Sequence, residues 1–139
     1  MVTYARVQCN VDMLHACLQG HLAVVRRCLE WRGPGGEWVD PREGDDEAVR
    51  FASSKGHTEL VRVFSKWRGP GGEWVDLRSG RNALVRAASR AGHVGVVEIL
   101  LEWTGPGGEW VDPREGDNDA VRIASENRRT GVLRVLLGW

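Results

Sequence analysis

The chain has 139 residues, of which 42% are hydrophobic, and its 19 basic and 19 acidic residues leave no net charge at pH 7. This length and composition predict a single domain, residues 1–139, with enough apolar side chains to bury a core. The absence of net charge argues against nucleic acid and against a membrane surface as partners.

The cysteines and the amino-terminal sequence indicate the compartment. Cys9, Cys17 and Cys28 are an odd number of thiols in one part of the chain, which does not fit a disulfide framework. The amino terminus has no apolar stretch of signal-peptide length. The sequence also has no run of about twenty apolar residues, which is the length that crosses a membrane. We therefore expect an intracellular, cytoplasmic protein.

The chain is built from an internal repeat. The sequence Gly-Pro-Gly-Gly-Glu-Trp-Val-Asp begins at Gly33, Gly69 and Gly105, a spacing of 36 residues. A fixed period of this length predicts one helical unit that recurs and stacks on its neighbours. The pattern divides the domain into four units, with approximate bounds 10–43, 44–79, 80–115 and 116–139.

Each unit predicts two helices joined by a tight turn. A first helix, over about 46–55 in the second unit, begins at Asp46, a residue type that caps helix amino termini; Asn82 and Asn118 are its equivalents. A Gly-His pair at Gly56 then predicts a left-handed turn. The second helix carries one apolar stripe per unit, which we expect to be buried. Its members are Leu60, Val61 and Phe64, then Val96, Val97, Leu100 and Leu101, then Val132, Leu133, Leu136 and Leu137.

The segment between units predicts a long loop. Gly-Pro-Gly-Gly cannot continue a helix, and Glu-Trp-Val-Asp after it is typical of an extended segment that leads into the next unit.

These features together resemble the ankyrin repeat. The resemblance rests on Gly-His before an apolar second helix, on Ala-Ser at the end of the first helix and on Val-Asp in the returning segment, and it covers about residues 10–139. It implies an all-α, ankyrin-like helix-turn-helix solenoid of about four repeats with long extended loops. It also implies a non-enzymatic protein–protein interaction scaffold or adaptor, which binds another protein through first helices and loop tips and needs no cofactor.

The sequence departs from the family pattern in three places. The repeat has 36 residues where the family has about 33, because the loop is enlarged. An arginine occupies the imidazole position of the family's opening motif, as Arg50, Arg86 and Arg122. In the last unit Arg128-Arg129 stands where Gly-His is expected, so Asn127 is the residue predicted to supply the left-handed turn.

Tryptophans and arginines of the loops are the candidate binding residues. Two interpretations of the loop tryptophans stay open: an exposed aromatic row that grips a partner, or pairs in which each indole closes its own loop. The tryptophans that follow the apolar stripes, Trp31, Trp67, Trp103 and Trp139, are expected to be structural. The predicted partner-binding residues are Trp38, Trp74, Trp110, Arg42, Arg78 and Arg114.

A second set of arginines has a structural interpretation. Arg50, Arg86 and Arg122 recur on the first helix near the recurrent Asp40, Asp76 and Asp112. We expect a ladder of charge-assisted hydrogen bonds to these carboxylates or to loop carbonyls.

No catalytic, cofactor-binding or metal-binding residues are predicted. His21, His57 and His93 lie one unit apart, roughly 10 Å, which is too far for one ion to reach them all. Cys17 takes the position that Ser53 holds in the next unit, as a small core residue does.

Two alternatives to protein binding remain from the sequence. One is a structural spacer within a longer array, and the other is a small-ligand or glycan binder that uses the loop tryptophans. The last helix, 132–139, is as apolar as the internal copies, which predicts an uncapped carboxy-terminal repeat and possible self-association.

Overall fold

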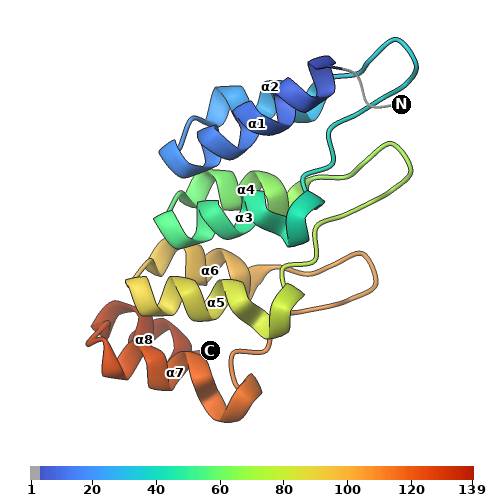
Figure 1. The fold of residues 1–139 in the computed structure, drawn as a ribbon. Coiled ribbons are helices and arrows are strands. Elements are labelled where there is room, and N and C mark those ends of the chain that lie inside the picture. Colours follow the sequence, from blue (N-terminus) through green and yellow to red (C-terminus); the bar gives the residue numbers. More distant parts are fainter. Residues whose placement is uncertain (1–3) are drawn as a thin grey trace.

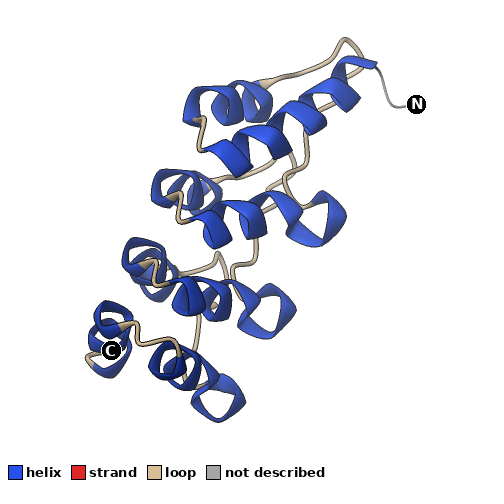
Figure 2. Cartoon of the chain, turned by 60° about the vertical axis from the view of Figure 1, so that its left-hand side comes forward, coloured by secondary structure: helices blue, strands red, loops and turns tan. Residues whose placement is uncertain are grey.

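The computed structural model describes residues 4–139, and this part of the chain contains eight α-helices and no strand (Figures 1 and 2). The prediction of an all-α fold is confirmed. No helix within 4–139 combines the length and the apolarity that crossing a membrane requires. The helices are α1 (Tyr4–Gln19), α2 (Leu22–Glu30), α3 (Glu43–Lys55), α4 (Thr58–Lys66), α5 (Ser79–Ala91), α6 (Val94–Glu102), α7 (Glu115–Glu126) and α8 (Thr130–Leu137).

The helices form four hairpins that stack in chain order. Each odd-numbered helix pairs with the even-numbered helix that follows it, and the odd helices also contact one another from hairpin to hairpin, as do the even ones. The molecule therefore has two layers, α1, α3, α5 and α7 in one and α2, α4, α6 and α8 in the other (Figure 1). The three long loops project from the same side of the stack.

The core lies between the two layers and between successive hairpins. Leu60, Val61 and Phe64 of α4 are at most 1% exposed, and Leu100 of α6 is fully buried. The predicted second-helix stripes are therefore buried faces, which is where most of the hydrophobic stabilisation of stacked helices arises. The stripe is incomplete at α8, where Leu137 is 72% exposed.

Glycine closes the turn inside the first three hairpins, as predicted. Gly20, Gly56 and Gly92 have φ values of 80°, 76° and 82°, in the left-handed region. Each glycine also lies against the next hairpin: a Cβ on Gly56 would come within 2.5 Å of Nδ1 of His93. That imidazole bonds through Nε2 to the Ser54 carbonyl at 3.0 Å, and His57 reaches the Leu18 carbonyl in the same way.

In the last hairpin two arginines replace the Gly-His pair at the turn. Arg128 adopts φ 57°, whereas Asn127 has φ −98°, so the prediction that Asn127 supplies the left-handed residue was wrong. Arg129 takes the histidine position, and its Nε donates to the Arg90 carbonyl at 3.0 Å. The contact between hairpins is thus kept although the residue types differ.

The left-handed turns make a prediction about glycine. Arg128→Gly should raise the free energy of unfolding by about 1 kcal/mol, because glycine adopts positive φ without the Cβ clash that arginine suffers. Gly56→Ala should lower the free energy of unfolding for two reasons: alanine is strained at positive φ, and its Cβ would clash with the His93 ring. Urea denaturation of both variants measures these effects, and a loss of stability in Arg128→Gly would contradict the turn geometry.

Candidate functional site

The layer of first helices and the adjoining loop ends contain the predicted binding residues. Each of α3, α5 and α7 begins with one left-handed turn: Gly44, Asp45 and Asp46 have φ values of 68°, 57° and 60°. The equivalent residues 80–82 and 116–118 repeat these angles within a few degrees. The backbone of this face is therefore the same in all three units.

Asp46, Asn82 and Asn118 stand directly before the right-handed part of the first helices, where a cap was predicted, but the side chains of Asp46 and Asn82 contact the next unit instead of the helix amino terminus. These residues lie inside the left-handed turn, and the right-handed helix begins after them. Asp and Asn are the non-glycine residues that best tolerate this conformation, which is the signal that the sequence carried. Arg81 is the one residue of another type among the six non-glycine positions of the three turns.

Arginines of the first helices stabilise the left-handed turns. The Nε of Arg50 donates to the Asp45 carbonyl at 3.0 Å, and its Nη2 donates to the Gly44 carbonyl at 3.1 Å. Arg86 and Arg122 reach the carbonyls of Gly80 and Gly116. The acceptors are thus carbonyls of the left-handed turns and not the predicted Asp40, Asp76 and Asp112, and Arg122 also pairs with the carboxylate of Asp119.

The recurrent aspartates pair instead with the arginines two residues further on. Arg42 donates from Nε and Nη2 to the two carboxylate oxygens of Asp40 at 2.9 and 2.8 Å, and Arg78–Asp76 and Arg114–Asp112 repeat the pair. Three of the predicted partner-binding residues thus already have an intramolecular partner. Their side chains remain at the surface, between 38% and 63% exposed.

These pairs lower the carboxylate pKa values. Burial would raise the pKa of Asp40 and Asp76, but hydrogen bonds from the neighbouring arginine outweigh it, so both lie below their usual 3.8. The pKa of Asp112 is lowered chiefly by the Arg114 side chain. A lowered pKa means stabilisation that is present above the ordinary value and is lost as the pH falls through the folded-state value.

A polar contact links each first helix to the next unit. The Nδ2 of Asn10 donates to Glu43 Oε2 at 3.0 Å, and Asn82 donates to Glu115 and to the Asp112 carbonyl. Asp46 takes the equivalent position in the middle contact, where its carboxylate lies close to the Ser79 side chain. Where the first helix carries an aspartate, the facing residue of the next unit is serine. Where it carries an asparagine, the facing residue is glutamate.

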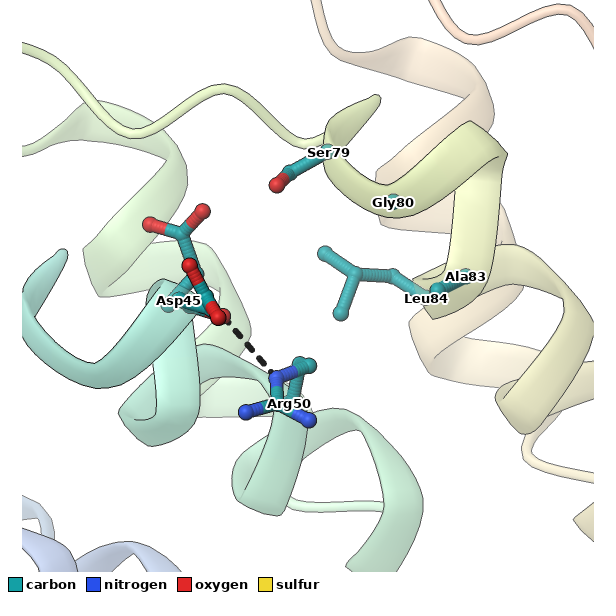
Figure 3. Close-up of a pocket in the computed structure, with 7 residues that line it drawn as sticks. Asp45, Arg50, Ser79, Gly80, Ala83 and Leu84 are labelled. Atoms are coloured by element: carbon teal, nitrogen blue, oxygen red, sulfur yellow. Dashed lines mark hydrogen bonds between the residues drawn. The ribbon is translucent and has the colours of Figure 1, made fainter.

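The middle contact borders a pocket of about 340 Å³ between α3 and α5. Asp45 and Arg50 come from α3, and Ser79, Gly80, Ala83 and Leu84 come from α5 (Figure 3). Asp46 also lines it, and burial is the main reason that its pKa is raised above 3.8. The pocket combines two carboxylates with an apolar wall, and it opens on the layer of first helices.

The loop tryptophans pair between units rather than within their own loops. Trp38 stacks on Trp67 of the next unit with ring centroids 5.9 Å apart and an interplanar angle of 28°, and Trp74 stacks on Trp103 with the same geometry. Trp110 and Trp139 form the third stack at 5.5 Å. Offset stacking of this kind favours the contact beyond the area that it buries. Within residues 4–139 no ring stack joins the two tryptophans of one loop, the pairing that the sequence allowed.

The predicted binding residues differ in how accessible they are. Trp38 and Trp74 are half-buried, while Trp110 is 46% exposed. In the last unit two of them converge, because the Arg114 guanidinium lies 5.2 Å from the centroid of the Trp139 ring on which Trp110 stacks. The first two units show no such cluster among the described residues.

The buried thiols are unsuited to nucleophilic chemistry. Burial raises the pKa of Cys17 and of Cys28 to about 12, so both are protonated at neutral pH. Within residues 4–139 no three His, Cys, Asp or Glu side chains lie together as the ligands of a metal ion would.

The chain matches no protein-family model, no curated protein and no solved structure at the level of significance that we required.

The middle polar contact gives a double-mutant prediction. Ser79→Glu alone should destabilise the fold, because it brings a second carboxylate to Asp46; Asp46→Asn alone should be neutral or stabilising. The two changes together recreate the Asn–Glu contact of the neighbouring units, so the cycle should show favourable coupling of about 1 kcal/mol in urea denaturation. Additive effects would contradict the contact.

Proposed function

We propose that the chain is an ankyrin-like solenoid of four repeats that serves as a non-enzymatic protein–protein interaction scaffold or adaptor. It binds a partner protein through its first helices and loop tips, in an intracellular, cytoplasmic setting. The observation that carries the proposal is a constant backbone with variable side chains on this face. Loops on one face of a repeat stack are where such proteins usually carry recognition.

The variation is concentrated beside the left-handed turns. The residue that follows the turn is Glu47, Ala83 or Asp119, and a half-buried position one helical turn later is Phe51, Ala87 or Ile123. A further pocket, between α1 and α3, has acidic Asp40, Glu43 and Glu47 around Met13 and Leu14. Asp40 and Glu43 already pair with Arg42 and Arg6, so Asp45 and Glu47 are the carboxylates of this face that favour a partner with basic and apolar side chains.

A charge-neutralising variant tests the proposed face. Peptides selected from a random display library on the immobilised chain should bind the double variant Asp45→Asn, Glu47→Gln at least tenfold more weakly, because two carboxylates of this face are lost. Both changes keep the fold, since asparagine also tolerates the left-handed position. Fluorescence anisotropy of the labelled peptides measures the affinity.

The matched control changes two carboxylates on the other layer, Glu98→Gln and Glu102→Gln, and should leave affinity unchanged. Failure to select any peptide, or selected peptides that are indifferent to the first pair of substitutions, would overturn the proposed binding face.

A second copy of the chain is the second candidate partner. Leu137 is 72% exposed and Trp139 is 47% exposed at the end of the last hairpin. Trp139 stacks on Trp110, which is also exposed, and a contiguous exposed apolar patch favours an interaction surface. Sedimentation at micromolar concentration should therefore show self-association that Leu137→Glu abolishes. A wild-type monomer with the same sedimentation coefficient as the variant would exclude this interface.

A further inference from the structure

A groove with a different character lies on the other layer, between α2 and α4. Its volume is about 650 Å³, and its apolar surface comes from Leu29, Val63 and Trp67. The charged residues that line it are Arg26, Glu30, Arg32, Lys66 and Arg68. The apolar surface is therefore flanked by four cations and one acid.

The cations of the groove are available to a ligand. Arg32 is held by hydrogen bonds from Nη1 to the carbonyls of Leu29 and Trp31, at 3.2 and 2.8 Å, and Arg68 donates to the Trp67 carbonyl at 2.7 Å. Within residues 4–139, no ion pair joins any of the four cations to a carboxylate at 4.0 Å or less. Two guanidinium groups are thus fixed by carbonyl oxygens, which leaves their charge uncompensated.

The next groove along the same layer shows that this charge is not a property of the repeat. Between α4 and α6 the groove is smaller, about 230 Å³, and Glu102 and Thr104 occupy the positions that Lys66 and Arg68 hold in the first groove. Ser65 likewise stands where the first groove has Leu29. The repeat geometry is shared, and the second groove also has an apolar wall, Ile99 and Trp103, but it has two cations, Arg62 and Lys66, where the first groove has four.

From this juxtaposition we propose that the α2–α4 groove binds an acidic peptide segment of a partner protein, with an apolar side chain of the peptide seated against Val63 and Trp67. Arginine side chains match carboxylates in a bidentate geometry, and a buried apolar anchor supplies the remaining affinity. Nucleic acid fits less well, because Glu30 lies among the cations and Glu102 interrupts the positive charge in the next groove. This surface is separate from the first-helix face of the proposed function.

The test uses a fluorescein-labelled peptide of about twelve Glu and Asp residues around one Leu-Phe pair. The wild-type chain should bind it at low ionic strength, and the double variant Lys66→Glu, Arg68→Thr should bind it at least tenfold more weakly, because charge complementarity is reversed at one wall. These substitutions introduce the residue types that the third unit carries at the same positions, so the fold is retained. Anisotropy titrations give the affinities, and thermal unfolding of each variant checks the fold.

A matched control makes the same substitutions elsewhere. Lys55→Glu with Arg90→Thr alters two exposed residues outside the groove by the same charge, and should keep the wild-type affinity. If both double variants bound the peptide equally weakly, net charge alone would explain the effect and the proposal would be overturned. Failure of the wild-type chain to bind the peptide would also overturn it. An oligothymidylate that binds the groove more tightly than the peptide would reassign it to nucleic acid. Retained binding by Asp45→Asn, Glu47→Gln would separate this groove from the first-helix face.

Discussion

The close approach of successive hairpins is the constraint on which the rest of the structure depends. A Cβ on Gly56 would lie 2.5 Å from Nδ1 of His93, and the His93 ring bonds through Nε2 to the Ser54 carbonyl of the preceding hairpin. Glycine at this turn therefore serves two purposes, positive φ and a short distance between units. Because the hairpins seat this closely, the second-helix stripes close into one continuous core.

The two layers present different surfaces, because different side chains line them. On the first-helix layer, arginine hydrogen bonds hold left-handed turns that present carboxylates and small apolar pockets. On the second-helix layer, the groove between α2 and α4 presents cations around Trp67. A chain with no net charge overall thus has a pocket with carboxylates on one layer and a groove with cations on the other.

Local sequence patterns predicted the hairpins but not the contacts between them. Gly-His turns and the stripe around Leu60 follow from local rules, so the helices, turns and buried faces could be read directly. The start of the right-handed helix after Asp46 was predicted, but the left-handed turn was missed, because Asp is favoured both at helix caps and in left-handed turns and only the preceding glycine favours the second. The Trp38–Trp67 stack joins different units, so the residue pattern of a single unit does not predict it. The contact of Asp46 with Ser79 could be found only by comparing units, because Asp46 replaces an asparagine where Ser79 replaces a glutamate.

The indole pairs also give the molecule an internal optical reporter. Two stacks share one geometry, at 5.9 Å and 28°, and the third differs, at 5.5 Å and 18°. Aromatic rings at such short distances couple electronically. Each pair therefore contributes a circular dichroism signal that exists only while two neighbouring units remain docked. Separation of adjacent hairpins is therefore visible spectroscopically even where both keep their helices, without any label added to the chain.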